Sequence, residues 1–278
     1  MGNTNNAVCL VTGASRGIGR GIALALLAEG ARVHVTGRTV TDSQAAVHPQ
    51  LEGSLDGLQV EAASLPGTLT IHVCDHADDA QTERAVADTV ATDGPIDILV
   101  NNAWPGYENM VEGEDFTWIR PFWEQPMWRW RSMMDVALRA AFVSARAAAP
   151  GMVARRSGLV VNISFWAAQR YDGNAIYGIA KAAADKMAAD FAHELRPHGV
   201  AAVSLYPGLV RTEAVMRNAE YFDMSNSESP QFIGHVIAGL WRDAALMDKS
   251  GGVHVAAALA QEYDIADIDG KRPVPLTL

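Results

Sequence analysis

The chain has 278 residues, of which 49% are hydrophobic and 19% are charged. This length and composition fit one large α/β domain or two small ones, with ample apolar residues for a buried core. The formal net charge of −10 argues against a nucleic-acid partner, because phosphate binding depends on clustered Lys and Arg.

The compartment is indicated by what the sequence lacks. The first ten residues, MGNTNNAVCL, have neither a basic segment nor an apolar segment of a secretion signal. We see no apolar run near 18 residues and therefore expect no membrane span. Cys9 and Cys74 lie in apolar, strand-like runs, which favours buried thiols of a reducing compartment over a disulfide. We expect a cytoplasmic protein.

Short strand-like runs alternate with longer helical patterns along the chain. The strand-like runs are residues 7–13, 31–37, 69–75, 96–103, 158–164, 200–208 and 251–258, and the helical patterns are 17–29, 78–92, 127–149 and 174–195. This alternation predicts βαβ crossovers, and the nearly all-apolar strands predict a parallel sheet covered on both faces. We therefore predict a single-domain, doubly wound, Rossmann-like α/β/α fold over residues 1–278.

Two stretches interrupt the alternation. Residues 39–68 are rich in Gly, Ser and Thr, and residues 104–130 are rich in Trp. We interpret both as excursions from one domain and not as linkers between two.

A glycine-rich segment, TGASRGIGRG (12–21), joins the first strand to the first helix. Its glycines allow a tight turn and close approach to a pyrophosphate, which the helix N-terminus would bind through unpaired N–H groups. A Gly-rich turn without a ligand is the alternative, but the strand–turn–helix context favours a dinucleotide. The turn residues predicted to contact it are Gly13, Ser15, Arg16, Gly17, Ile18 and Gly19.

The end of the second strand indicates which dinucleotide is bound. An NAD site usually has Asp or Glu there, whereas this chain reads TGRT (36–39), with Arg38 in that place. Arg16 could reach the same phosphate, and a guanidinium matches a phosphate better than a bare hydroxyl. The alternative is two solvated arginines. We predict NADP(H).

The pentapeptide YGIAK (177–181) places Tyr177 and Lys181 four residues apart on a predicted helix, so both side chains share one face. A phenol with a pKa of about 10 is a poor base at neutral pH, but a nearby ammonium lowers that pKa. The pair could then exchange a proton with a substrate oxygen. The alternative is a packed Tyr beside an exposed Lys.

Four motifs in this order resemble the short-chain dehydrogenase/reductase family: TGASRGIG, NNA (101–103), YGIAK and YPGLVRT (206–212). The resemblance covers about residues 7–275. It implies hydride transfer between nicotinamide and a ketone, aldehyde or secondary alcohol. FWEQP (122–126), residues 181–200 and DIDGKRPV (267–274) resemble one subgroup. That subgroup consists of NADPH-dependent carbonyl reductases with apolar substrates such as steroids and xenobiotic ketones.

The resemblance also implies a catalytic triad of Ser164, Tyr177 and Lys181. Ser164 lies thirteen residues before Tyr177, the family spacing, although a second family serine would fall on Phe165. Ala137 stands where the family usually has an asparagine that binds a relay water. A backbone carbonyl with water could replace that asparagine, Asp135 could replace it, or catalysis is weakened.

Further cofactor positions follow from the same resemblance: Asp75 for adenine, Asn101 and Asn102 beside the adenine ribose, and Pro207, Gly208, Val210 and Thr212 near the nicotinamide. For Asn101 and Asn102, a turn stabilised by Asn side chains is an alternative that is compatible with the same placement. A helix N-cap is the alternative for Thr212.

Six of the seven tryptophans lie between residues 104 and 166. Loops at the carboxyl ends of parallel strands converge on the ligand crevice, so aromatic residues there suit an apolar carbonyl compound. The predicted wall is Trp104, Phe165, Trp166 and Tyr171; packing of an insertion onto the core is the alternative for several tryptophans, those from 118 to 130 in particular. Residues 213–231 resemble the family's substrate lid or form a plain surface loop.

The sequence as a whole favours an NADPH-dependent carbonyl reductase. A non-catalytic NADP-binding sensor of the same fold is the main alternative, and enoyl reduction is disfavoured by the short Tyr-to-Lys spacing. We expect no metal, because no Cys, His or carboxylate cluster has ligand spacing. The alanine-rich helix after Tyr177 allows close helix approach, so a homodimer or homotetramer is expected.

Overall fold

The computed structural model describes residues 3–45 and 52–277. In this part of the chain, seven parallel strands form one sheet in the order β3-β2-β1-β4-β7-β8-β9, and β5 and β6 form a separate hairpin. The sheet strands are β1 (Val8–Val11), β2 (Arg32–Gly37), β3 (Thr68–Val73), β4 (Ile98–Asn101), β7 (Leu159–Ile163), β8 (Ala201–Tyr206) and β9 (Val253–Val255). The predicted doubly wound parallel sheet is confirmed.

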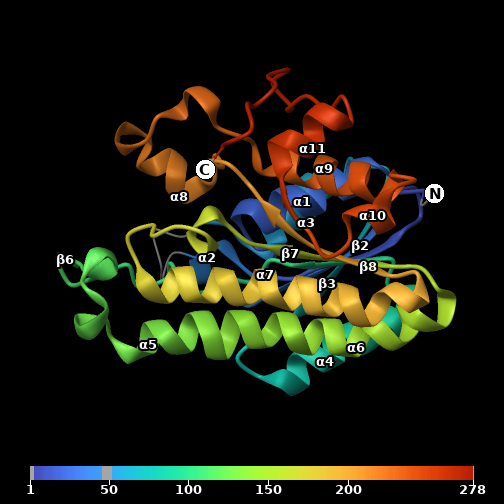
Figure 1. The fold of residues 1–278 in the computed structure, drawn as a ribbon, viewed down its shortest axis with the longest axis horizontal. Coiled ribbons are helices and arrows are strands. Elements are labelled where there is room, and N and C mark those ends of the chain that lie inside the picture. Colours follow the sequence, from blue (N-terminus) through green and yellow to red (C-terminus); the bar gives the residue numbers. More distant parts are fainter. Residues whose placement is uncertain (1–2, 46–51, 278) are drawn as a thin grey trace.

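Helices cover both faces of the sheet, as Figure 1 shows. One face carries α1 (Gly17–Ala28), α3 (Leu55–Ala62), α9 (Pro230–Arg242), α10 (Leu246–Lys249) and α11 (Ala256–Glu262). The other face carries α4 (Asp79–Asp93), α6 (Arg139–Arg155) and α7 (Ala175–Leu195). Three short α-helices remain in the described residues: α2 (Asp42–Ala45), α5 (Met127–Trp130) and α8 (Glu213–Arg217).

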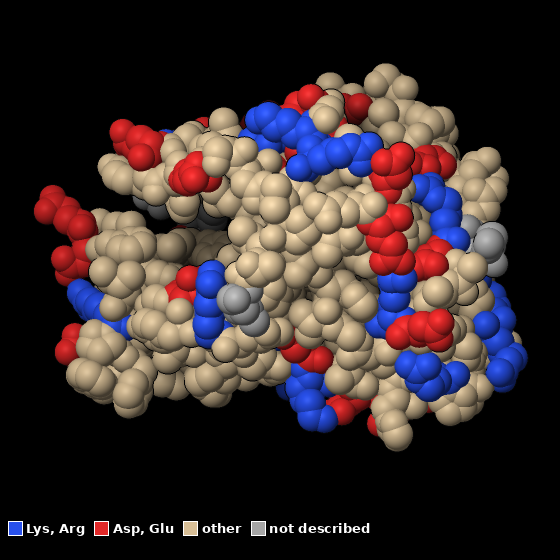
Figure 2. Space-filling model, turned by 45° about the horizontal axis from the view of Figure 1, so that its top comes forward, with Lys and Arg blue, Asp and Glu red and all other residues tan. Residues whose placement is uncertain are grey.

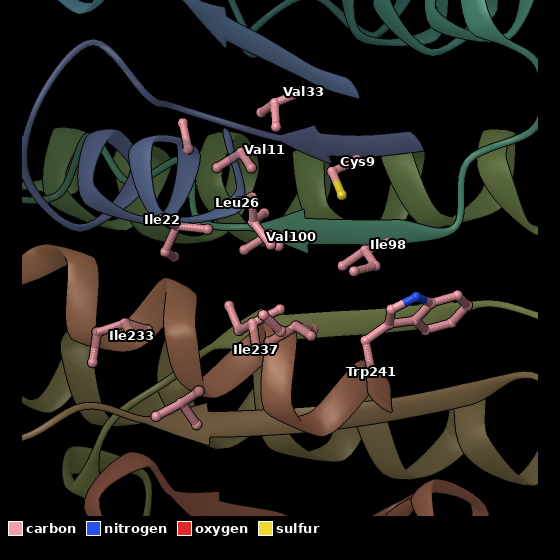
Figure 3. Packing of buried hydrophobic residues seen from close by; sticks show 14 of the residues in the cluster. Cys9, Val11, Ile22, Leu26, Val33, Ile98, Val100, Ile233, Ile237 and Trp241 are labelled. Atoms are coloured by element: carbon pink, nitrogen blue, oxygen red, sulfur yellow. The ribbon is translucent and has the colours of Figure 1, made fainter. Parts of the chain in front are cut away.

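Alternate residues of each strand face opposite layers. In β1, Cys9 and Val11 enter the core beneath α1 and α9, whereas Val8 and Leu10 enter the core beneath α4 and α6. Figure 3 shows Cys9 and Val11 together with apolar side chains of β4, α1 and α9. Each such side chain contributes about 1.5–3 kcal/mol when fully buried. These two apolar cores fix the sheet that carries the site.

Helices α1 and α9 cross at short range because glycines line the crossing. A Cβ atom on Gly21 would lie 2.2 Å from the Pro230 carbonyl carbon, and one on Gly234 would lie 2.6 Å from the Ala25 Cβ. Helix α9 is not among the helical patterns identified from the sequence. Its start has the expected signal nonetheless, since the Ser229 hydroxyl accepts from the Phe232 N–H at 3.0 Å and Pro230 follows directly.

The interrupting stretches contain short elements. Residues 39–68 include α2 and α3, and residues 46–51 lie outside the described part of the chain. Residues 104–130, called the insertion below, contain β5 (Val111–Glu112), β6 (Asp115–Phe116), two 3-10 turns, η1 (Thr117–Ile119) and η2 (Phe122–Glu124), and α5 (Met127–Trp130). A π-helical segment, η3 (Arg131–Leu138), connects the insertion to α6. Four further 3-10 turns follow in the described residues: η4 (Trp166–Ala168), η5 (Arg196–His198), η6 (Ala219–Tyr221) and η7 (Met224–Asn226).

One helical stretch in the described residues, Met127–Arg155, is long and apolar enough to cross a membrane by length and composition alone, with a mean hydropathy of 1.2. It comprises α5, η3 and α6, and α6 packs against α4 and β4 in the layer beneath the sheet. A core helix meets the same criterion, so this is weak support for a span.

Candidate active site

The predicted site residues gather at the carboxyl ends of the central strands. The turn after β1, the asparagines after β4, the loop after β7 and the Pro-Gly turn after β8 all leave the sheet at this edge. Figure 2 shows the molecule hollowed on its left side, between the parts that Figure 1 places around α8 and around β6. Parallel α/β sheets bind ligands at this edge.

The glycine turn is held from β2 and β4. Gly13 has φ +70°, and its N–H donates to the Thr36 hydroxyl at 3.0 Å. The Asn102 side chain donates to the carbonyl oxygens of Thr12 at 3.0 Å and Gly13 at 2.9 Å. A Cβ on Gly13 would lie 2.7 Å from the Ala103 Cα, so a larger residue could not keep this turn against β4.

The N-terminus of α1 already holds an anion. The Gly17 N–H donates to the Glu213 carboxylate at 2.9 Å, and Glu213 is the first residue of α8. Helix N-termini attract anions because their first N–H groups are unpaired and lie at the positive end of the helix dipole. This N–H is therefore available to a phosphate that displaces Glu213. Ile18 and Gly19 continue the same first turn, and Ser15 precedes Arg16, the N-cap residue.

The two predicted phosphate-binding arginines flank this turn. Arg16 donates to the Thr39 hydroxyl at 2.8 Å, and its buried Nε has no partner among the residues that the structure describes. Arg38, after β2, forms an ion pair with Glu108 of the insertion. Burial lowers the pKa of Arg16, while the charges of Glu108 and Glu213 oppose that shift. Two carboxylates thus lie beside the cations and the helix end predicted for the cofactor.

Asp75 and Asn101 occupy different surroundings. The Asp75 carboxylate accepts from the Ala77 N–H at 3.0 Å in the turn after β3. Asn101, at the end of β4, donates to the Asn162 side chain of β7 at 2.9 Å, so it ties neighbouring strands together.

Tyr177 and Lys181 lie on the first turns of α7. The helix begins at Asn174, whose side chain accepts from the Tyr177 N–H at 3.0 Å. The Lys181 ammonium donates to the Ile163 carbonyl at 3.1 Å and lies 4.0 Å from the centroid of the Trp104 ring. The same ammonium is 5.7 Å from the centroid of the Tyr177 ring. The spacing read from YGIAK therefore brings both groups into one buried site.

Burial dominates the ionisation of this pair. It raises the pKa of Tyr177 well above its ordinary value, and the neighbouring Tyr107 adds to that rise. It lowers the pKa of Lys181 to about 8, although the Asp185 charge opposes the shift. Burying a charge without full solvation disfavours the charged form in both cases. Tyr177 is thus a firmly protonated acid in this structure, and Lys181 still carries its charge at neutral pH.

Ser164 directly follows the last residue of β7. Its hydroxyl donates to the Lys181 carbonyl oxygen at 3.2 Å, and the side chain is 2% exposed. The next residue, Phe165, faces the phenol instead, and the centroids of the Phe165 and Tyr177 rings are 6.2 Å apart. The structure therefore brings Tyr177, Lys181 and Phe165 together and holds the Ser164 hydroxyl against the backbone of α7.

Four aromatic side chains, called the aromatic cage below, surround the Tyr177 ring. Their ring centroids lie 5.3–6.2 Å from its centroid, and they are Trp104, Tyr107, Trp118 and Phe165. Trp166 instead packs against Tyr206 at 5.2 Å, and Tyr171 is 72% exposed. The insertion thus supplies three of the four cage residues: Trp104, Tyr107 and Trp118. Of these, Tyr107 and Trp118 were not among the residues predicted for the substrate wall.

The position of the family asparagine lies in the π-helical segment η3. Ala137 is buried there, whereas Asp135 is exposed. The Lys181 ammonium donates directly to the backbone carbonyl of Ile163, and the three alternatives for the relay stay open. π-Helical turns occur often at functional sites.

The turn after β8 is fastened by Glu228. The Gly208 N–H donates to the Glu228 carboxylate at 2.8 Å, and Val210 forms a bridge with the same residue. Burial raises the pKa of Glu228 to about 7. Thr212 caps α8, since its hydroxyl accepts from the Val215 N–H at 3.3 Å. The alternative role for Thr212 is thus present here, and Pro207 lies in the same turn.

A cavity of about 630 Å³ borders this turn and the glycine turn. Its lining includes Gly17, Arg211, Glu213 and Pro230, so α1, α8 and the start of α9 all contribute. In the described part of the chain, no three His, Cys, Asp or Glu side chains gather as they would around a metal ion.

The sequence reasoning missed four site residues: Tyr107, Glu108, Glu213 and Glu228. Glu213 follows a threonine N-cap, a usual position for an acidic residue, so local sequence favours a capping role only. Tyr107 and Glu108 lie in an irregular segment without periodicity. Their contacts with residues 70 positions away in sequence could only be found in the tertiary structure.

Comparison with known proteins agrees with this architecture. The family model described as short chain dehydrogenase matches residues 7–221. Dehydrogenase/reductase SDR family member 1 of Homo sapiens is 37% identical over 97% of this chain and 85% of its own length, and the Mus musculus protein of that name is 38% identical over 96% and 84%. This similarity confirms the subgroup resemblance predicted from residues 122–126, 181–200 and 267–274.

More distant relatives share the fold. L-xylulose reductase of Bos taurus is 35% identical over 73% of this chain and 71% of its own length. The crystal structure of a putative dehydrogenase from Xanthomonas campestris superposes with a TM-score of 0.81 at 24% identity, covering 99% of this chain and 98% of that chain. At that identity the likeness supports the fold alone.

Proposed function

Because this chain belongs to the short chain dehydrogenase family, whose members are oxidoreductases that use a nicotinamide cofactor, we propose that it is an NADP(H)-dependent carbonyl reductase. The substrate is an apolar or aromatic ketone or aldehyde, steroid-like or xenobiotic, and the reverse oxidation of the corresponding alcohol uses the same site. The observation that carries the proposal is the buried Tyr177–Lys181 pair inside the aromatic cage.

The residues present fit a dinucleotide. The Gly17 N–H donates to a carboxylate, so it can donate equally to a pyrophosphate oxygen. Within the described part of the chain the buried Arg16 Nε lacks a partner, and a phosphate would supply one. The residues that would hold the cofactor are those of the glycine turn with Arg38, Asp75, Asn101, Pro207, Gly208, Val210 and Thr212.

The preference for NADP(H) rests on the cations after β2. Arg38 and Arg16 present two guanidinium groups, and the Glu108 charge acts on both. A 2′-phosphate would compete with Glu108 for Arg38 and form a charge-assisted, bidentate contact. The ribose of NAD has only a hydroxyl there, which gains much less from a guanidinium.

The bound cofactor supplies the hydride. Tyr177 donates the proton to the carbonyl oxygen, and its raised pKa keeps that proton in place until charge develops on the oxygen. The Lys181 ammonium lies close enough to stabilise the phenolate that remains. The Ile163 carbonyl and the Trp104 ring hold this ammonium in position.

The aromatic cage favours apolar substrates. Trp104, Trp118 and Phe165 present ring faces and edges around the reactive phenol, and such surfaces gain little from a highly hydroxylated substrate. We extend the proposal to the cytoplasm as location and to a homodimer or homotetramer as assembly, without a nucleic-acid partner.

A second candidate is an NADP-binding sensor without turnover. The orientation of the Ser164 hydroxyl and the alanine at position 137 favour it, because each removes a polar group that the family uses. The buried Tyr177–Lys181 pair opposes it.

A substrate panel tests the proposal. Purified protein is mixed with NADPH or NADH and with aromatic, steroid and sugar carbonyl compounds, and cofactor absorbance is followed. We expect NADPH oxidation with the apolar compounds and a loss of about 10³-fold or more in kcat for Tyr177→Phe, with the NADPH Kd unchanged. Tight NADPH binding without turnover across the panel would instead establish the sensor.

A further inference from the structure

Tyr107 is the residue that meets the reactive phenol in this structure. Its hydroxyl donates to the Tyr177 hydroxyl at 3.1 Å. The Tyr107 side chain is 42% exposed, so its ring lies at the mouth of the site while its hydroxyl points inward. A substrate oxygen that accepts the Tyr177 proton must come to within hydrogen-bond reach of the same hydroxyl.

Tyr107 is held on both sides. Its ring packs against Trp118 at 5.5 Å and Trp104 at 6.0 Å. The following residue, Glu108, donates its N–H to the Pro105 carbonyl at 3.2 Å and pairs through its side chain with Arg38. The position of the hydroxyl is thus set by two aromatic neighbours and by a fastened turn.

No comparable donor comes from the loop after β7. The Ser164 hydroxyl is committed to the Lys181 carbonyl, and the adjacent Phe165 presents a ring. Charge that develops on a carbonyl oxygen during hydride transfer is stabilised by more than one preorganised donor in most enzymes of this kind of chemistry. Tyr177 supplies one, and a second place beside it is occupied by Tyr107.

We propose that Tyr107 is a catalytic residue that donates a hydrogen bond to the substrate oxygen beside Tyr177, the role that sequence spacing assigns to Ser164. This inference rests on the proposed carbonyl reduction. The carbonyl carbon gains hydride, the π electrons of the C=O bond move to oxygen, and the Tyr177 proton completes the hydroxyl group. The resulting Tyr177 phenolate then accepts from Tyr107, and solvent returns the lost proton.

Tyr107 is suited to donate and to keep its own proton. Burial raises the pKa of Tyr107 to about 12, and the hydrogen bond with Tyr177 opposes only part of that rise. The hydroxyl therefore stays protonated at every pH at which the enzyme is assayed. The proton that leaves in reduction comes from Tyr177, because the Lys181 ammonium lies 5.7 Å from the centroid of the Tyr177 ring and stabilises its phenolate.

The test compares steady-state reduction of one ketone by four proteins: wild type, Tyr107→Phe, Ser164→Ala and Tyr263→Phe. Phe keeps the ring packing against Trp118, so a fall in kcat reports the hydroxyl. We expect kcat of Tyr107→Phe to fall about 100-fold, the usual loss for one oxyanion donor, with the NADPH Kd within twofold. The kcat of Ser164→Ala should fall less than that of Tyr107→Phe. The Tyr263 hydroxyl donates to Asp243 at 2.8 Å outside the site, so Tyr263→Phe controls for removal of a hydrogen-bonded, partly buried phenol hydroxyl.

A rescue variant strengthens the result. Phe165 faces Tyr177, so Phe165→Ser in the Tyr107→Phe background should recover at least about fivefold in kcat by supplying a new donor. Turnover by the wild type establishes the proposed function independently of Tyr107. A kcat for Tyr107→Phe equal to that of wild type, a lower KM in that variant, or a larger loss in Ser164→Ala would each overturn the role of Tyr107.

Discussion

The apolar core beneath α1 and the parts that close the site are built differently. The core cluster around Cys9, Val11 and Ile22 consists of hydrophobic side chains alone. The insertion and the segment after β8 bury ionisable side chains, with Arg129 fully buried and Glu228 2% exposed. A hydrophobic side chain is satisfied by any apolar neighbour, whereas a buried ion requires particular partners. The site is therefore the part of the molecule whose stability should depend on single partners and on pH.

The largest effect is expected at Arg129. Its guanidinium donates to the Thr117 carbonyl at 3.0 Å and hydroxyl at 2.9 Å and lies 4.7 Å from the Trp128 ring centroid. Arg129→Met leaves these acceptors without their donor, and we expect unfolding free energy to fall by about 3 kcal/mol or more. Urea unfolding measures this. Arg131→Met, at an exposed position in the next turn, serves as control and should change stability by less than about 0.5 kcal/mol.

Glu228 should make stability depend on pH. Burial raises the pKa of Glu228 from 4.5 to about 7. Between these values the folded protein keeps a proton that the unfolded chain loses, so stability falls as pH rises. Glu228→Gln lacks this titration and should gain up to about 3 kcal/mol relative to wild type between pH 4.5 and 8.

Unfolding curves at several pH values check this change. Ile22→Val, in the apolar core, should cost about 0.5–1.5 kcal/mol at every pH. If the difference in unfolding free energy between Glu228→Gln and wild type did not change with pH, Glu228 would behave like Ile22. That result would contradict the contrast between the two regions.

Arg38 should decide cofactor choice. Arg38→Ala removes a charge-assisted contact to the 2′-phosphate, and we expect the NADPH Kd to rise about 30-fold, about 2 kcal/mol, while the NADH Kd changes little. Titration of protein fluorescence with each cofactor measures both values.

Glu108→Gln tests the same 2′-phosphate contact, with a change in the NADPH Kd in the opposite direction. It removes the carboxylate that pairs with Arg38, so NADPH should bind severalfold more tightly, with little effect on NADH. Equal changes for both cofactors in both variants would refute a 2′-phosphate role for Arg38.

The effect that appears only at alkaline pH concerns Lys181, whose pKa burial lowers to about 8. Reduction should lose about tenfold in kcat/KM for each pH unit above that value, because the neutral amine no longer stabilises the phenolate. The Asp185 charge raises this pKa, so Asp185→Asn should move the alkaline limb to lower pH. The measurement is the pH dependence of kcat/KM from pH 6 to 10 for wild type and Asp185→Asn. If the alkaline limb lies at the same pH in both proteins, Lys181 is not its source.

Much of the fold could be predicted because it follows local rules. The apolar runs predicted six of the seven sheet strands to within two residues at each end, and the glycine turn, Tyr177 and Lys181 lie where the motifs predict. Strand β9 ends at Val255, and α11 takes the rest of the predicted run 251–258, since an alanine run suits a helix as well as a buried strand. Helix α9 was missed although Ser229 and Pro230 mark its start.

The sequence by itself determined the parallel sheet, the dinucleotide turn and the Tyr-Lys pair, because strand alternation, glycine conformation and helical spacing act over a few residues. Only the tertiary structure decided which hydroxyl meets Tyr177, which carboxylates lie beside Arg38 and Gly17, and which way Ser164 points. Those contacts join residues far apart in the chain through irregular segments, where side-chain packing and the need to pair each buried polar group outweigh local preference.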